Sequence, residues 1–392
     1  MNSRIVLILA VMMLLIAGIG MAEETGAVIP EIETKDMLIP DNEAMRLIRD
    51  MKAGWNLGNT FDAIDCHWLK NPLEYECGWC GVITSEKLMD ALQQAGFRTI
   101  RIPVSWHNHL DKEWTIDPAW LTRVQEVAGW AYDRGMYVIV NIHHDCDPAY
   151  YYPDTAHSEN SEKYMRTIWH QLAEAFRDWG NRLILESINE PRLKDTDHEW
   201  WWDASHPECQ DAMAQIVKLN QVFVDTVRAT GGNNADRYLM VPAYDASPDY
   251  ACESAFTLPE DSADNRIIVS AHAYSPYNFA LEQPGIDSFS LNNASQKSGI
   301  TGFLDKLYHA YVARGIPVLM GEFGAMEKNG NLQDRVNWIA YYVSQARARG
   351  ITCCWWDNHV FQGNGERFGL FDREKAACVN PVLLEAFMRY AE

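Results

Sequence analysis

Short apolar runs alternate with longer segments of helical periodicity along most of the chain. Eight runs are rich in β-branched and aromatic residues and close on polar motifs, as buried parallel strands do. They cover residues 53–59, 99–105, 137–143, 183–189, 238–244, 266–274, 317–323 and 351–358. We therefore predict eight strands.

The segments between these runs carry apolar residues three and four positions apart, which predicts amphipathic helices. In 85–96, Leu88, Leu92 and Ala95 fall on one face, and Gly96 follows as a stop. Further helices are predicted at 118–135, 161–180, 208–231, 302–315 and 332–350, with at most a short one between the fifth and sixth strands. This alternation predicts an α/β protein with a (β/α)8 TIM-barrel fold.

The N-terminus has the pattern of a targeting segment. Arg4 precedes an uncharged apolar run, and Ala22 offers a small residue for cleavage. We predict a signal peptide at 1–22, an N-terminal extension at 23–40 and one catalytic domain at 41–392. The protein would then be secreted, to the periplasm or the extracellular medium. A retained membrane anchor is the alternative, because the run approaches the length of a membrane span.

Acidic residues outnumber basic ones, 54 to 33, which gives a net charge of −21. A surface of this sign repels nucleic acid and anionic lipid, so we expect no nucleic-acid partner and no membrane partner after cleavage. A neutral substrate suits such a surface. We expect the protein to act as a monomer.

Nine cysteines are present, an odd number that leaves at least one unpaired. Cys66, Cys77 and Cys80 lie close together in the sequence, and we expect a disulfide within this group or with Cys146. A zinc knuckle is less favoured, because His67 is the only fourth ligand nearby.

Two carboxylates end apolar runs that a barrel places roughly opposite each other. Glu190 follows the fourth run and Glu322 closes the seventh. Barrel active sites lie at the carboxyl ends of the strands, and glycosidic bond cleavage uses a facing pair of carboxylates. A gap of about 5 to 5.5 Å favours retention of configuration, and about 6.5 to 9.5 Å favours inversion. Either glutamate alone is more readily read as a solvated surface residue, so the pair carries the hypothesis.

Other polar residues gather at the same strand ends. Arg101 is expected to hold a carboxylate ionised and oriented, whereas Glu190 is expected to have a raised pKa and to be protonated. His272 and Tyr274 share a strand parity and so face the same side. Singly, each can be a hydrogen-bonded core residue.

The stretch His143–His144–Asp145 has ligand types that metals accept. Adjacent side chains in a strand point to opposite faces, so His143 and His144 reach one ion only if the chain turns between them. We therefore expect no metal and no other cofactor, with metal-dependent hydrolysis as the minor alternative.

Fifteen tryptophans are present, and several lie in loops expected on the catalytic side. Flat aromatic faces pack against sugar rings, which favours a carbohydrate substrate. The candidates are Trp106, Trp200, Trp201, Trp202, Trp355 and Trp356. The alternative reading is that Trp200, Trp201 and Trp202 anchor a long loop.

Seven motifs follow one another along the chain, one at each of seven strand ends. They are GWNLGNTFDA (54–63), RIPVSW (101–106), IHHD (142–145), SINEP (187–191), HAYSPYNFA (272–280), GEFGA (321–325) and WWDN (355–358). In this order they resemble glycoside hydrolase family 5, the cellulase A family, and most closely its subfamily 4. The resemblance extends over about residues 41–390.

This resemblance implies a retaining endo-β-1,4-glucanase that acts on cellulose, mixed-linkage glucan, xyloglucan and sometimes xylan. It implies that Glu190 is the acid/base and Glu322 the nucleophile. The supporting residues would be Arg101, His143, Asn189, His272 and Tyr274. The expected substrate contacts are Asn59, His144, Trp201, Trp202 and Trp356, with Trp355 as the less favoured floor of the cleavage site.

Two loops depart from the family pattern. ECGWCGV (76–82) keeps Glu76 and Trp79 but inserts cysteines, and His359 follows Asn358 where relatives often have glycine. Both departures concern substrate preference more than reaction type. A β-mannanase or xylanase on the same scaffold is the second enzyme hypothesis, and a non-catalytic glucan-binding protein is the hypothesis from another class.

Overall fold

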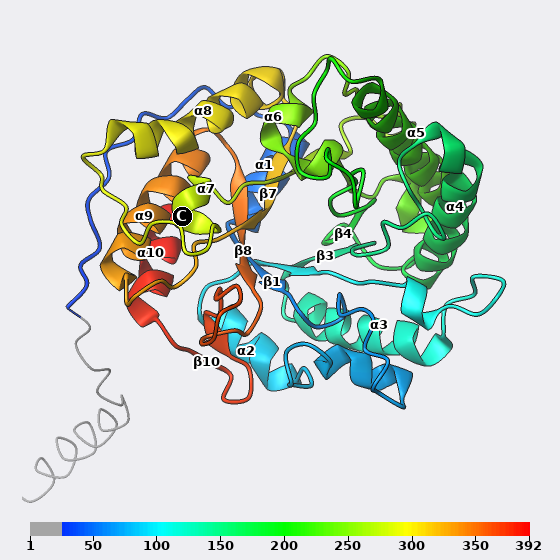
Figure 1. The fold of residues 1–392 in the computed structure, drawn as a ribbon, viewed down its shortest axis with the longest axis horizontal. Helices are drawn as coiled ribbons and strands as arrows, with labels where there is room; N and C mark the ends of the chain where they lie inside the picture. The colour runs from blue at the N-terminus through cyan, green and yellow to red at the C-terminus, as the bar shows by residue number, and fades with distance from the viewer. Residues whose placement is uncertain (1–25) are drawn as a thin grey trace, which may run out of the picture.

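The fold is a closed barrel of eight parallel strands in chain order, with β8 pairing back to β1 (Figure 1). The structure, a computed structural model, describes residues 26–392, so the predicted signal peptide at 1–22 lies outside the described residues. The strands are β1 (Ala53–Leu57), β2 (Thr99–Ile102), β3 (Tyr137–Asn141), β4 (Leu183–Glu186), β5 (Leu239–Pro242), β6 (Ile267–His272), β7 (Val318–Phe323) and β8 (Thr352–Asp357). The predicted TIM barrel is confirmed.

Each predicted apolar run contains one strand, but most strands end before the run does. β3 ends at Asn141 and β4 at Glu186, so the motif residues that follow lie in loops. The backbone at these positions is no longer paired in the sheet, and the polar side chains that it carries lie over the carboxyl end of the barrel.

Helices surround the barrel as an outer ring (Figure 1). They include α2 (Glu86–Gln94), α3 (Pro118–Asp133), α4 (Ser158–Ala175), α5 (Pro207–Ala229), α6 (Pro248–Ala251), α7 (Tyr277–Ala280), α8 (Ala294–Ala310), α9 (Leu332–Ala348) and α10 (Pro381–Ala391). α8 begins earlier than the predicted start at 302, because the Asn293 side chain caps it by accepting hydrogen bonds from Ser295 N and Gln296 N. α7 and α10 were not predicted.

A further helix, α1 (Glu43–Met51), closes the amino end of the barrel. Its apolar side buries Ala44 and Ile48 against interior side chains such as Ile184 and Ile268. The Thr99 hydroxyl donates to the carbonyl of Met51 at 2.9 Å and so ties β2 to the helix. With this end filled by apolar side chains, the polar residues collect at the opposite end.

Two register shifts interrupt the ladders of β7. One lies on the β6 side between Ala271 and His272, and the other lies on the β8 side between Met320 and Phe323. The first shift brings His272 and Glu322 into register with each other. Irregularities of this kind commonly re-aim side chains beside active sites.

Residues 26–40 form an extended segment, the N-terminal strap, on the outer side of α9 and α10 (blue in Figure 1). Val28 exchanges two hydrogen bonds with the Gln333 side chain, at 2.7 and 2.8 Å. The Tyr390 hydroxyl donates to Pro30 O at 2.6 Å and accepts from Ile32 N at 3.0 Å. The domain division at residue 41 stays a prediction.

Within residues 26–392, no helix combines the length and the apolar composition that crossing a membrane requires.

All nine cysteines, which lie within the described residues, are free thiols, so the predicted disulfide among Cys66, Cys77, Cys80 and Cys146 is wrong for this structure. Each of these thiols instead faces a backbone carbonyl. Cys77 Sγ lies 3.2 Å from Glu74 O, and Cys146 Sγ lies 3.3 Å from Arg192 O. Closeness in the sequence did not bring the sulfur atoms together.

Candidate active site

Glu190, in the loop after β4, and Glu322, in β7, face each other across the carboxyl end of the barrel. His272 Nδ1 lies 2.8 Å from Glu190 Oε1 and 3.8 Å from Glu322 Oε1. One carboxylate oxygen of each glutamate and one imidazole nitrogen all lie within 4.8 Å of one another. This separation is near the range of about 5 to 5.5 Å at which a second carboxylate can attack directly, and well below that of inverting enzymes.

Arg101 is fully buried and orients the Glu322 carboxylate. Its guanidinium donates to Glu322 Oε1 at 2.7 Å and, through another nitrogen, to Asn189 Oδ1 at 2.7 Å. The Tyr274 hydroxyl donates to the other oxygen, Glu322 Oε2, at 2.8 Å. Burial raises the pKa of Tyr274 well above its ordinary value, and the Glu322 charge adds to the effect, so the phenol remains a donor.

A second carboxylate, Glu186, shares Arg101, and sequence reasoning missed it. Arg101 Nε donates to Glu186 Oε2 at 2.7 Å, and both side chains are inaccessible to solvent. Asn141 Nδ2 at 3.0 Å and the Ser270 hydroxyl at 2.7 Å donate to the same carboxylate. The signal was its parity, since Glu186 is two residues after the interior residue Ile184 along β4 and so points to the same face.

His272 and Glu190 form a buried pair that shares one hydrogen bond. Burial lowers the pKa of His272, but the Glu322 charge and the bond to Glu190 outweigh burial, and the pKa rises above 6.5. Burial alone would raise the pKa of Glu190, but the hydrogen bond and charge of His272 and the charge of Arg192 lower it below 4.5. The predicted raised pKa of Glu190 is therefore wrong, because the contact with His272 lowers it.

Gly321 makes room for this imidazole. A Cβ at this position would lie 2.9 Å from His272 Nε2, a distance that real Cβ atoms do not show. A side chain at position 321, directly before Glu322, would therefore clash with His272, which explains the glycine there.

His143 and His144 lie side by side although the predicted strand would have pointed them apart. β3 ends at Asn141, so strand alternation no longer applies, and the two rings are 4.4 Å apart. Burial lowers the pKa of His143 well below its usual range and that of His144 to about 4. With Asp62 they offer ligand atoms within 4.8 Å of one another, so the parity argument against a metal was wrong.

The predicted tryptophans differ in burial and contacts. Trp356 lies parallel to His143, with 3° between the rings and 5.8 Å between centroids, whereas Trp355 is fully buried and donates its indole N–H to Phe368 O. Trp201 is 69% exposed. Trp202 is buried and donates to Cys209 O, so it anchors its loop, and its predicted sugar contact is wrong.

The remaining predicted residues take different positions. Asn189 is buried against Arg101, as described above. Asn59 has a left-handed backbone (φ 56°) and donates its backbone N–H to Asp62 Oδ2 at 3.0 Å. Trp79, retained from the family pattern, is 40% exposed and lies beside His144, with ring centroids 5.7 Å apart. Glu76 is instead structural, because it accepts two hydrogen bonds from Arg123.

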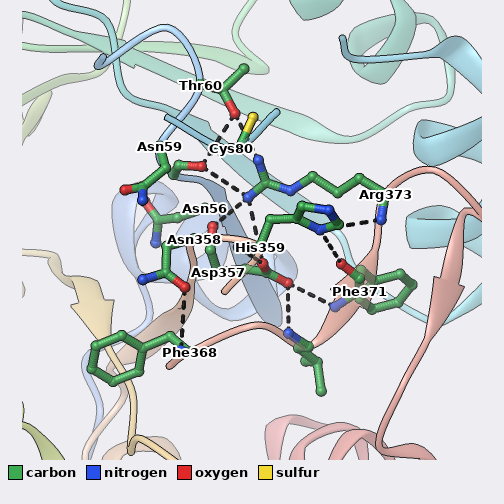
Figure 2. A network of polar contacts seen from close by, with 12 residues as sticks. Asn56, Asn59, Thr60, Cys80, Asp357, Asn358, His359, Phe368, Phe371 and Arg373 are labelled. Carbon is green, nitrogen blue, oxygen red and sulfur yellow. Dashed lines mark hydrogen bonds and ion pairs between the residues drawn. The ribbon is translucent and has the colours of Figure 1, made fainter. Parts of the chain in front are cut away.

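Asp357, in the WWDN motif, is a structural bracket at the end of β8 (Figure 2). One oxygen accepts from Trp55 Nε1 and from the backbone N–H groups of Leu370 and Phe371, at 2.9 to 3.0 Å. Arg373 donates to Thr60 Oγ1 at 2.7 Å and so joins this bracket to the loop after β1. The network fixes the backbone directly after Trp356.

Two further charged residues near Glu190 were not predicted. Arg192 donates to the Glu190 carbonyl at 3.0 Å and lies over the Trp200 ring at 4.0 Å. Asp245 has a left-handed backbone (φ 55°) and an Oδ1 that is buried without a hydrogen-bond partner. Burial, with the Glu190 charge, raises the pKa of Asp245 well above its ordinary value.

The fold and the pair of carboxylates together indicate a class of enzyme. One carboxylate is held by arginine and tyrosine and the other by histidine, all at the carboxyl ends of the strands. This is the arrangement of a glycoside hydrolase.

Comparison with known proteins gives the family. The model of the cellulase family, glycosyl hydrolase family 5, matches residues 60–362. Endoglucanase B of Ruminococcus albus is 42% identical over 352 residues, which cover 89% of this chain and 81% of that protein. The chain therefore belongs to glycosyl hydrolase family 5.

Solved structures narrow the assignment. A family 5 lichenase from Caldicellulosiruptor sp. F32 has 53% identity and a TM-score of 0.92, over 93% of this chain and all of that one. A broad-specificity endoglucanase of subfamily 4 from Ruminococcus champanellensis, with bound cellotriose, has 41% identity and a TM-score of 0.82, over 90% and 100% of the two chains. The chain is a member of subfamily 4.

Proposed function

We propose that Glu322 is the nucleophile and Glu190 the acid/base of a retaining, endo-acting β-1,4-glucan hydrolase. The observation that carries the proposal is the position of both carboxylates within 4.8 Å of His272 Nδ1 and of each other. The endoglucanase and lichenase names of the relatives support the same reaction and a β-glucan substrate.

In the first step, a Glu322 oxygen attacks the anomeric carbon, and the glycosidic bond breaks as Glu190 donates its proton to the leaving oxygen. In the second step, Glu190 accepts a proton from water, and the water oxygen displaces Glu322 from the anomeric carbon. Arg101 and Tyr274 orient the Glu322 carboxylate, and Asn189 lies beside it for a sugar hydroxyl.

The acid step needs a proton on Glu190, whereas in the free protein the contact with His272 lowers the pKa of this carboxyl and the Glu190 contact raises the pKa of His272. The hydrogen bond of 2.8 Å between His272 Nδ1 and Glu190 Oε1 is a direct path for that proton. A sugar that excludes water from Glu190 favours its neutral form, because burial disfavours the carboxylate. His272 is thus the proposed donor of the proton that Glu190 delivers to the leaving oxygen.

The roles of the two glutamates are separated by paired variants. Glu322→Gln should lose at least about 10³-fold in kcat on every substrate, because no covalent intermediate forms. Glu190→Gln should lose a similar factor on β-glucan but retain much more activity on aryl glycosides whose leaving group needs no proton. Equal loss on both substrates, or full activity of the Glu322 variant with unchanged circular dichroism, would contradict the assignment.

A panel of polysaccharides tests the substrate class. We expect reducing sugar from cellulose, mixed-linkage glucan or xyloglucan, with a rapid fall in viscosity, as endo cleavage produces. Release from mannan alone or xylan alone would favour the mannanase or xylanase alternative, and no release would favour a glucan-binding protein. Hydrolysis should survive dialysis against a chelator, whereas complete loss restored by metal would favour metal-dependent hydrolysis.

We also propose that the protein is exported and acts as a monomer. The basic and apolar pattern of residues 1–22 supports export. N-terminal sequencing of the protein from the medium or periplasm should begin after Ala22, and light scattering should give the mass of one chain.

A further inference from the structure

The loop from β4 to α5, residues 187–206, contains the acid/base Glu190 and carries two exposed aromatic side chains. Trp200 and Trp201 are 57% and 69% exposed. Trp200 stacks under Arg192, which follows Glu190 by two positions and donates to its carbonyl. The position of this loop therefore bears on how a long sugar chain meets the site.

Where the loop enters α5, two histidines and a carboxylate converge. His198 Nε2 lies 3.4 Å from Glu208 Oε1, and His206 Nδ1 lies 3.5 Å from the same oxygen. One atom of each residue lies within 4.8 Å of the others. A tetrahedral ion with bonds of about 2.0 to 2.1 Å has ligands about 3.3 to 3.4 Å apart, close to these separations.

The second ring nitrogen of His198 is also placed as a metal site requires. His198 Nδ1 lies 3.1 Å from Trp201 O, and since a carbonyl only accepts, Nδ1 carries the hydrogen and Nε2 presents a lone pair to Glu208. His206 Nδ1 is the ring nitrogen that faces Glu208, and its Nε2 is 3.9 Å from Asp203 Oδ2, beyond hydrogen-bond distance. An outer hydrogen bond such as that of His198 fixes the tautomer of a metal-bound histidine.

The backbone beneath the cluster is held firmly. The Tyr244 hydroxyl, just after β5, donates to His198 O and accepts from Leu193 N. Glu208 lies in the first turn of α5, whose positive end disfavours a cation. The Glu208 and Asp203 carboxylates oppose that effect, and the side chains remain partly exposed, so we expect weaker binding than in a closed structural zinc site.

We propose that His198, His206 and Glu208 bind a divalent transition ion, zinc being the best match, with water as the fourth ligand. Two nitrogens and one carboxylate oxygen suit zinc better than magnesium or calcium, which prefer oxygen ligands. The ion joins the loop to the start of α5 and so fixes the segment that carries Trp200 and Trp201. It is a clamp on the cleft and takes no part in bond cleavage.

Calorimetric titration of the untagged, metal-stripped chain with Zn²⁺ tests the site. We expect one zinc per chain, with affinity at least about tenfold weaker in both His206→Gln and Glu208→Gln. His157→Gln is the matched control, because His157 contacts a single carboxylate, Asp154, at 2.7 Å and has no third ligand. Absent binding overturns the proposal. Equal affinity in the wild type and the two site variants also overturns it, because zinc would then be bound elsewhere, by thiols or by the catalytic residues.

The clamp itself has a separate readout. Zinc should lower KM for polymeric β-glucan and change tryptophan fluorescence in the wild type and in His157→Gln, without changing kcat, and should do neither in His206→Gln. Zinc that binds through His206 but leaves both KM and fluorescence unchanged rejects the clamp. Hydrolysis of a short aryl glycoside does not involve the zinc ligands or Trp200 and Trp201. The loss of that activity in Glu322→Gln therefore tests the proposed function separately from the zinc site.

Discussion

Arg101 is shared between two carboxylates with different surroundings. Glu186 is sealed inside the barrel, and Glu322 borders the cleft. A buried arginine needs a permanent partner, since an unpaired buried charge costs several kcal/mol. Glu186 supplies that partner, so Arg101 stays charged and in place when Glu322 becomes an uncharged ester in the proposed intermediate.

The His272–Glu190 pair makes stability depend on pH in a definite direction. The raised pKa of His272 contributes stability below 6.5 that is lost as pH rises through its folded pKa. The lowered pKa of Glu190 contributes stability above 4.5 that is lost as pH falls through its folded pKa. Both contributions are complete only between these two values.

His272→Asn should therefore lower the free energy of unfolding most between pH 4.5 and 6.5, by about 2 kcal/mol. Denaturant titrations of both proteins at several pH values measure the difference. A difference that is the same at pH 3, 5.5 and 9 would contradict the pairing.

At the residue scale, the sequence motifs predicted which residues form the site. They did not predict properties that depend on neighbours in space, such as a pKa or the burial of a side chain. Glu190, Glu322 and Arg101 follow from position at strand ends. The pKa of Glu190 depends on His272, from a strand remote in sequence, and no local pattern reports that distance. Trp202 was misassigned because an aromatic residue in a loop has the same sequence signal whether it faces solvent or packs inward.

At the element scale, the Asp357 bracket controls how β8 ends. It ties β8 to β1 through Trp55. It also ties β8 to the following loop through two backbone N–H groups, one of them that of Phe371 (Figure 2). Asp357→Asn places an amide N–H against these donors, and we expect a loss of about 2 kcal/mol in unfolding free energy. KM for β-glucan should rise because Trp356 loses its fixed backbone.

Asp372→Asn is the control for this experiment. Asp372 pairs with the exposed Lys375 at 2.6 Å, and such pairs contribute about 0.5 kcal/mol or less. Equal stability loss in the two variants, or an unchanged KM in Asp357→Asn, would show that the bracket does not position Trp356.

Periodicity predicted the eight strands and most long helices, because each buries one side for many residues. The predictions failed where local caps or non-local contacts decide. α8 begins at its Asn293 cap in a polar stretch, and α1 is a short helix whose stability comes from filling the barrel end. The register shift that aligns His272 with Glu322 leaves no mark in either strand alone.

At the scale of the whole molecule, the N-terminal strap contributes to stability without contacting the cleft residues described above. Removal of residues 26–36 deletes the bonds to Gln333 and Tyr390 and the packing of Ala27 and Ile29. We expect a loss of about 2 kcal/mol in unfolding free energy with unchanged kcat, measured by denaturant titration and initial rates.

Glu31→Gln should change stability by about 0.5 kcal/mol or less, because it removes only the exposed pair with Arg389. A truncated chain as stable as the full one would show that the strap contacts carry no net free energy.

The strap also makes the two ends of the folded chain neighbours. Pro30 and Tyr390 share a hydrogen bond of 2.6 Å, so a short linker from Glu392 to this segment would join them without moving the barrel. The eightfold arrangement of strands is closed by pairing β8 with β1, and it has no structural first strand. A circular permutant opened in an exposed segment, such as 286–288 before α8, should therefore keep the same cleft.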